Sequence, residues 1–239
     1  MTLQSFMPTA LIEFLMKGNQ TTVITGSKGS GKTTSMMSLV ELIDPMFNLL
    51  TLEENVEYLR KLYPLHNIIA LRDNRFDFKE KDIKYTSDYD VLVFDEMEEQ
   101  DSIFANQYLN SRFSIFTHYG KDFSEVVACL RNSFLKKGII DNVKAAEQHV
   151  VNLIDFNIHV VRENDGPRYI ERITECVPLS SPNGDQLYEA RNIVEIKDEA
   201  YVTVHPISQQ RQEMIECNLS EEEKVAFRAF NKLHWMDET

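Results

Sequence analysis

The chain has 239 residues, of which 43% are hydrophobic and 26% are charged, so its composition excludes a disordered, collagen-like or low-complexity protein. With 25 basic and 38 acidic residues the formal net charge is −13, which disfavours a general nucleic-acid or anionic-membrane binder because long-range repulsion opposes the approach. The three cysteines lie far apart without a C-x-x-C pair, so neither a disulfide framework nor a zinc site is indicated.

The first 136 residues are predicted to alternate short strands with helices. We predict strands at 21–25, 48–52, 67–71, 91–94 and 113–117, and helices at 8–17, 33–42, 56–63, 102–108 and 124–136. Because the strands are short, apolar and continuous, the pattern is typical of a parallel sheet that helices cover on both faces.

From residue 153 the pattern changes to antiparallel hairpins. Strands 155–161 and 169–177 flank a Glu-Asn-Asp-Gly turn, a second hairpin is predicted at 190–196 and 200–204, and residues 218–220 cap a final helix at 221–233. We therefore predict an α/β domain at residues 1–178 and a small C-terminal appendage at 179–239.

The sharpest motif fits G-x-x-x-x-G-K-[ST] in full and lies between a predicted strand and a predicted helix. It reads Gly26, Ser27, Lys28, Gly29, Ser30, Gly31, Lys32, Thr33, and Thr34 follows. Glycines let backbone N–H groups surround phosphate oxygens, and the helix adds its positive N-terminal dipole. We expect these nine residues to bind ATP, with Lys32 at the β- and γ-phosphates and Thr33 on Mg²⁺. The alternative is a surface Gly/Ser turn.

A second motif is the acidic pair that ends the predicted strand 91–94. Asp95 and Glu96 follow four apolar residues, which is the pattern that a nucleotide-hydrolysing site needs beside its phosphate loop. One acid would reach Mg²⁺, and the other would orient the attacking water or take its proton. The alternative is a solvated acidic loop, because Glu98, Glu99 and Asp101 continue the charge run.

Over roughly residues 3–178, the ordered set of motifs resembles the type II/type IV secretion ATPase superfamily, and within it most nearly the CpaF-like motors of Tad/Flp pili and the related conjugation ATPases. The matching segments are ITGSKGSGKTT at 24–34, LTLEENVE at 50–57, LRDNR at 71–75, Asp95-Glu96, FTH at 116–118 and EQHVVNLID at 147–155, followed by IHVVR and ITE. The resemblance implies a RecA-like P-loop fold with a mostly parallel sheet.

The resemblance also implies roles for single residues. Residues 50–57 correspond to the acidic segment of the family, which usually reads I-E-D-x-x-E. By this resemblance Glu53 is the acid that orients water, and Glu54 replaces the family's Asp as a metal ligand beside Asp95. Glu96 becomes the second catalytic acid, and His118 senses the γ-phosphate. Arg75 would approach phosphate in its own or a neighbouring subunit. The alternatives are that Glu53 and Glu54 cap a helix, that His118 is structural, and that Arg75 pairs with the acidic surface.

The resemblance implies an ATP-hydrolysing, Mg²⁺-dependent motor of a pilus, secretion or conjugation machine. It implies a hexameric ring on inner-membrane platform proteins, in the cytoplasm at the inner face of the membrane. No segment reads as a signal peptide or a membrane span. Before Asp95, only residues 79–90 stand where the family has a long helix, so we expect that helix to be missing or shortened, and no segment of the printed sequence resembles the family's N-terminal domain. These departures motivate the rival hypothesis of a nucleotide-binding but catalytically weak regulatory subunit. A nucleic-acid-dependent ATPase is a third hypothesis, which the charge of −13 disfavours.

Overall fold

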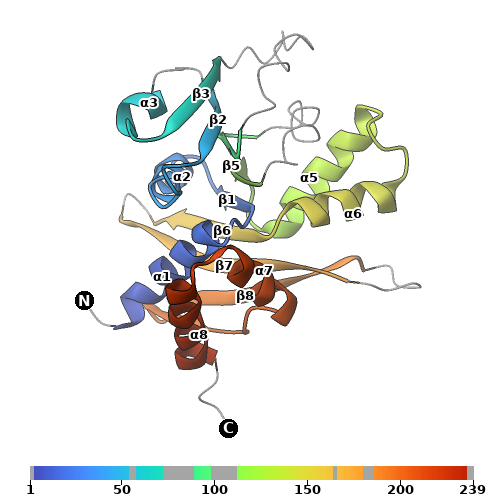
Figure 1. Cartoon of the computed structure of the whole chain (residues 1–239). Coiled ribbons are helices and arrows are strands. Elements are labelled where there is room, and N and C mark those ends of the chain that lie inside the picture. Colours follow the sequence, from blue (N-terminus) through green and yellow to red (C-terminus); the bar gives the residue numbers. More distant parts are fainter. Residues whose placement is uncertain are drawn as a thin grey trace.

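The computed structural model describes residues 3–53, 58–72, 89–97, 112–163, 166–179 and 186–235 (Figure 1). In this part of the chain one sheet has the strand order β3-β2-β4-β5-β1-β6-β7-β8-β9. The strands are β1 (Thr22–Gly26), β2 (Asn48–Glu53), β3 (Asn67–Arg72), β4 (Val91–Phe94), β5 (Phe113–Tyr119), β6 (Phe156–Arg162), β7 (Arg168–Pro178), β8 (Tyr188–Lys197) and β9 (Ala200–Thr203). Strands β3 to β6 of this order pair in parallel and β6 to β9 pair antiparallel, which confirms the predicted mostly parallel α/β sheet.

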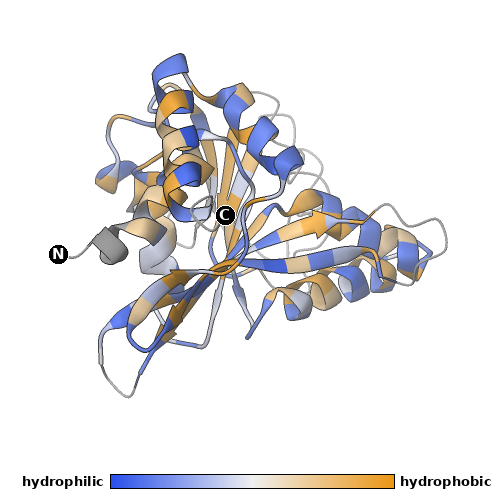
Figure 2. Ribbon diagram, turned by 90° about the horizontal axis from the view of Figure 1, so that it is seen from below, coloured by the Kyte–Doolittle hydropathy of each residue, from blue (hydrophilic) through white to orange (hydrophobic). Residues whose placement is uncertain are grey.

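Helices cover both faces of the sheet, and this explains why its central strands carry buried apolar residues on both faces. The helices are α1 (Leu3–Lys17), α2 (Lys32–Val40), α3 (Tyr58–Leu62), α5 (Phe123–Lys136), α6 (Val143–Leu153), α7 (Gln209–Asn218) and α8 (Glu221–Trp235). On β1, Ile24 faces one core with α1, α2, α7 and α8, whereas its neighbour Val23 faces a second core with α5 and α6. Hydrophobic residues accordingly predominate in the central strands, whereas the helices carry both hydrophobic and hydrophilic residues (Figure 2).

The C-terminal residues share the sheet and the core of the rest of the chain. β8 and β9 continue the sheet from β7, and α8 lies beside α1 (Figure 1). The ring of Phe14 on α1 lies 5.1 Å from that of Phe227 and 5.5 Å from that of Phe230. The sheet and the core both include residues from either side of position 178. The division into a domain at 1–178 and an appendage at 179–239 stays a prediction.

A buried ion pair fastens α7 to the end of the sheet where β1 begins. The guanidinium of Arg211 pairs with the carboxylate of Asp155 and donates to Oε1 of Gln20 at 3.1 Å. Burial raises the pKa of Asp155, and the charge of Arg211 opposes that shift. Glu175, which is 1% exposed, accepts from the backbone N–H of Ser208 at 2.9 Å directly before α7. This end of the sheet is therefore closed by charged groups that compensate one another.

Several elements differ from the sequence prediction. Helices α6 and α7 were not predicted, and α1 begins at Leu3 with Pro8 inside it rather than near its start. The predicted cap of the last helix is confirmed as a reciprocal capping box: Ser220 Oγ accepts from the N–H of Glu223 at 3.3 Å, and the Glu223 carboxylate accepts from the N–H of Ser220 at 3.0 Å. The predicted helix at 102–108 lies outside the described residues. Within the described ranges, no helix combines the length and the apolar character that crossing a bilayer requires.

Candidate functional site

The phosphate-loop motif connects β1 to α2 at the carboxyl ends of the parallel strands. Gly31 precedes the helix at φ 103° and Gly29 lies at φ 79°, in the left-handed region that glycine adopts most readily. A Cβ atom on Gly26 would overlap the hydroxyl of Ser30 and the carbonyl oxygen of Val160 on β6. The path of the loop therefore depends on glycine at three positions, twice through backbone angle and once through close packing.

Two polar groups of the loop are arranged as a phosphate cradle requires. The hydroxyl of Ser30 is buried and has no hydrogen-bond partner in the described part of the chain. The ammonium of Lys32 donates to the carbonyl oxygens of Gly26 at 3.2 Å and Ser27 at 3.1 Å. Burial lowers the pKa of Lys32, and the acidic side chains after β4 oppose this shift. A phosphate oxygen could accept from both the orphan hydroxyl and the ammonium, so the loop fits an anion.

The carboxylate of Asp95, directly after β4, is held by hydroxyls from two other elements. Thr33 Oγ1 on α2 donates to it at 2.9 Å, and Thr117 Oγ1 on β5 donates at 2.8 Å. The same Thr117 hydroxyl accepts from the backbone N–H of Glu96 at 2.7 Å, so one fully buried hydroxyl orders two consecutive acids. Glu96 is exposed and has φ 60°, which is a strained value for a residue other than glycine. Such backbone strain often occurs at functional sites.

Thr33 and Asp95 also supply the oxygen donors that Mg²⁺ prefers. In nucleotide sites this ion takes one or two protein ligands and completes its shell with phosphate oxygens and water. The contact between Thr33 and Asp95 matches that requirement. Among the residues that the structure describes, no group of three or more His, Cys, Asp or Glu side chains could hold a metal ion.

His118 and Tyr119 border the loop from the end of β5. His118 is 6% exposed, and its Nδ1 lies 2.8 Å from the carbonyl oxygen of Met97. Because a carbonyl only accepts, Nδ1 carries the hydrogen and Nε2 is left as an acceptor. Burial lowers the pKa of His118; the hydrogen bond to Met97 opposes this shift and the charge of Lys32 adds to it, so the neutral imidazole is favoured. The exposed ring of Tyr119 lies 5.8 Å from Nζ of Lys32.

The structure thus brings Lys32, Thr33, Asp95 and His118 together around one loop. Glu53 is the last residue of β2, at the sheet edge where β4 also ends, because Leu52 pairs with Phe94. The side chain of Glu53, and the whole of Glu54 and Arg75, lie outside the described residues, so their roles stay predictions.

Sequence reasoning missed Thr117, which links the two acids. Its signal was a hydroxyl in a mostly apolar buried strand, directly before the histidine. Such a position requires a hydrogen-bond partner in the core. The identity of that partner became visible only through the pairing of β4 with β5.

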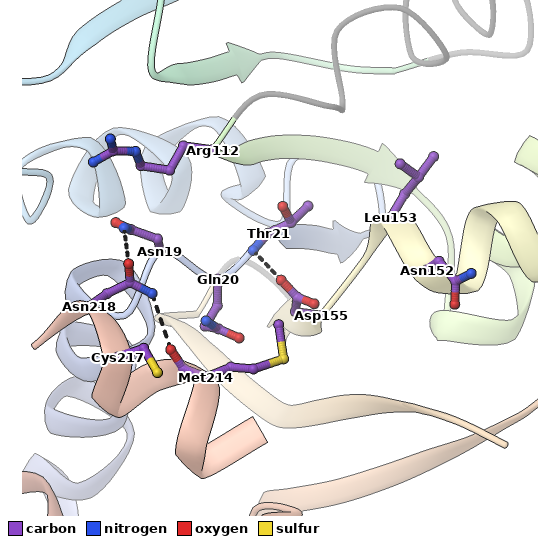
Figure 3. Close-up of a pocket in the computed structure, with 10 residues that line it drawn as sticks. All are labelled: Asn19, Gln20, Thr21, Arg112, Asn152, Leu153, Asp155, Met214, Cys217 and Asn218. Carbon is purple, nitrogen blue, oxygen red and sulfur yellow. Dashed lines mark hydrogen bonds between the residues drawn. The ribbon is translucent and has the colours of Figure 1, made fainter. Parts of the chain in front are cut away.

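A cavity of about 510 Å³ lies at the opposite end of β1 from the phosphate loop (Figure 3). Its polar lining groups largely satisfy one another: Asn19 Nδ2 donates to Asn218 Oδ1 at 3.0 Å, and the N–H of Thr21 donates to Asp155 at 2.8 Å. The cavity therefore belongs to the junction between α7 and the sheet and presents few free polar groups to a ligand.

The comparisons with known proteins rest on structure. No protein-family model and no curated protein matches the sequence. Among solved structures, the VirB11 ATPase of the Brucella suis type IV secretion system, in complex with sulphate, aligns with 70% of this chain and 52% of its own, at a TM-score of 0.60 and 19% identity. The Legionella pneumophila ATPase DotB aligns with 95% of this chain and 56% of its own, at a TM-score of 0.50 and 16% identity.

The chain has the fold of these secretion ATPases. The RecA-like α/β class that the sequence predicted is confirmed, and so is the resemblance at the level of the fold. The chain spans a little more than half the length of each of the two proteins.

Proposed function

We propose that this chain binds Mg·ATP at Gly26–Thr34 and hydrolyses it as a motor subunit of a type II/type IV secretion, pilus-assembly or conjugation machine. The observation that carries the proposal is the hydrogen-bonded link from Thr33 through Asp95 and Thr117 to Glu96, directly beside a phosphate loop. It brings a metal ligand set and a candidate general base to the place where a γ-phosphate would lie.

In this proposal each group has one task. Lys32 exchanges its two loop carbonyls for phosphate oxygens, and the hydroxyl of Ser30 gains an acceptor. Thr33 and Asp95 hold Mg²⁺, which when bound neutralises charge on the phosphates. The exposed carboxylate of Glu96 orients the attacking water and takes its proton. His118, whose Nδ1 is held by Met97, lies close enough to Lys32 to feel its charge, so loss of the γ-phosphate would change its surroundings.

The machine-level part of the proposal rests on the fold shared with VirB11 and DotB. A ring of several copies would work at the cytoplasmic face of the inner membrane, docked on platform proteins of the machine. Hydrolysis in one subunit would then move it relative to its neighbours. The net charge of −13 favours a protein platform over nucleic acid as the partner.

Nucleotide binding with matched variants tests the site. We expect Lys32→Ala to weaken Mg·ATP binding at least about tenfold, because it removes the charge-assisted contacts. Lys232→Ala, which removes an exposed lysine of α8 outside the phosphate loop, should bind like the wild type. Equal binding by the wild type and Lys32→Ala would refute the site.

Turnover tests the acid. Glu96→Gln should bind Mg·ATP and lose most hydrolysis, whereas Glu41→Gln, an exposed acid at the far end of α2, should keep it. Undiminished hydrolysis by Glu96→Gln would contradict the role of Glu96. Binding by the wild type without any hydrolysis would instead favour a regulatory nucleotide-binding subunit.

A further inference from the structure

The hairpin of β6 and β7 touches the phosphate loop at two points. The carbonyl oxygen of Val160 on β6 packs against Gly26, where the loop begins. At the other end of the loop, the side chain of Arg168, the first residue of β7, crosses Gly31. A Cβ atom on Gly31 would lie 2.6 Å from Cδ of Arg168 and 3.2 Å from its Nε. The absence of a side chain at Gly31 therefore lets a guanidinium lie directly against the start of α2.

The charge of Arg168 is not compensated within the described part of the chain. No hydrogen bond or ion pair holds its guanidinium there, and its side chain is exposed. The residue opposite it on β6 is Arg162, another cation. The nearby acid Glu163 accepts instead from the hydroxyl of Tyr169 at 2.7 Å. An exposed guanidinium that has no partner of its own among the described residues and faces another cation suits an anionic ligand such as a phosphate.

The sheet order decides which part of a nucleotide this partner would be. Asp95 directly follows β4 and His118 belongs to β5, on one side of β1, whereas Arg168 belongs to β7, on the other side. Under the proposed function, Mg²⁺ and the γ-phosphate lie on the side of Asp95. The α-phosphate and the nucleoside then extend toward the hairpin of β6 and β7.

We propose that Arg168 is a nucleotide-binding residue that holds the α-phosphate of the bound nucleotide. A guanidinium can give two parallel N–H donors to one phosphate, and the backbone N–H groups at the start of α2 would face the same oxygens. This inference rests on the proposed nucleotide site, but it concerns a residue of the hairpin, outside both the phosphate loop and the acidic pair.

Binding of Mg·ADP and Mg·ATP tests the inference, with ATP measured in the Glu96→Gln background to prevent turnover. We expect Arg168→Ala to weaken both nucleotides by the same factor, about tenfold, because both contain the α-phosphate. Arg168→Lys keeps the charge without the paired donors and should recover part of the loss. Arg228→Ala, an exposed arginine on α8, controls for the lost charge and should change neither affinity.

Each outcome bears on one claim. Unchanged affinity in Arg168→Ala would overturn the inference and mean that the side chain only packs on Gly31. A loss for ATP but not for ADP would also overturn it, since Arg168 would then face the γ-phosphate. If the wild type and Lys32→Ala bind nucleotide equally poorly, the proposed function fails and not this inference alone. Thermal denaturation of each variant shows that a lost affinity does not come from a lost fold.

Discussion

Replacing Thr117 with valine tests how the candidate site orders its two acids. Valine keeps the shape of threonine but has no hydroxyl. In the native chain this hydroxyl, which is fully buried, donates to Asp95 at 2.8 Å and accepts from the N–H of Glu96 at 2.7 Å. Thr117→Val therefore removes a donor from a carboxylate and leaves a backbone N–H without an acceptor, while the packing of β5 changes little.

The expected cost follows from these two bonds. A buried group left without its partner costs about 1–3 kcal/mol, and water can replace only the bond to the partly exposed Asp95. We expect about 2 kcal/mol of destabilisation, which for a chain of this size lowers Tm by about 4–8 °C. Release of Glu96 from its strained backbone position should also lower ATP turnover, by about tenfold or more, with a smaller change in nucleotide affinity.

Thr174→Val is the matched control. Thr174 is 3% exposed on β7 and donates one hydrogen bond, to Oδ1 of Asn192 at 2.8 Å, far from the phosphate loop. Its loss should cost about 1 kcal/mol and leave turnover unchanged. Thermal denaturation and steady-state ATP hydrolysis of both variants provide the comparison. If Thr117→Val keeps wild-type turnover and melts no lower than the control, the ordering role of the hydroxyl is refuted.

Three further perturbations follow from the structure. Gly26→Ala should weaken nucleotide binding and lower Tm more than Gly29→Ala does. A Cβ at Gly26 overlaps neighbouring atoms, whereas one at Gly29 meets nothing within 4 Å and brings only the strain of its φ of 79°; equal effects would contradict this explanation. Arg211→Met should cost about 3–5 kcal/mol in a denaturant titration, because Asp155 keeps a buried charge without its partner, and a loss below about 1 kcal/mol would count against it. Burial lowers the pKa of His159, so on acidification the unfolded chain takes up the proton first and stability is lost as the pH falls below the unfolded value of 6.5. Unfolding measured at several pH values should therefore show a steeper loss for the wild type than for His159→Gln, and parallel curves would exclude this contribution.

The parallel half of the fold could be predicted because each strand there is buried on both faces. β4 is apolar throughout and β1 carries Val23 and Ile24 in succession, and in both strands adjacent apolar side chains enter opposite cores. Such a run, followed by a helical segment, leaves few alternatives to a covered parallel sheet.

Helix α7 could not be predicted from hydrophobic periodicity. Its sequence, QQRQEMIECN, buries only Arg211 and Ile215. The helix is held instead by the Ser208 cap and by the ion pair of Arg211 with Asp155. Asp155 lies 56 positions before Arg211 in the chain. A helix fixed by distant charged contacts has no local apolar signature.

The candidate site divides in the same way. The phosphate loop is a local pattern, so the sequence alone gives its residues and their place between a strand and a helix. The link of Thr117 to Asp95 and Glu96 requires the alignment of β4 with β5, and the contact of Arg168 with Gly31 requires the hairpin to return beside the loop. Neither contact joins residues that lie near each other in the sequence.

Steady-state ATP hydrolysis over a range of protein concentrations, with Lys32→Ala as the blank, tests the central claim most directly. We predict hydrolysis that saturates with Mg·ATP, is absent from Lys32→Ala, and rises in specific activity with protein concentration as subunits assemble. Wild-type hydrolysis at the level of Lys32→Ala across the whole range would contradict the proposed motor.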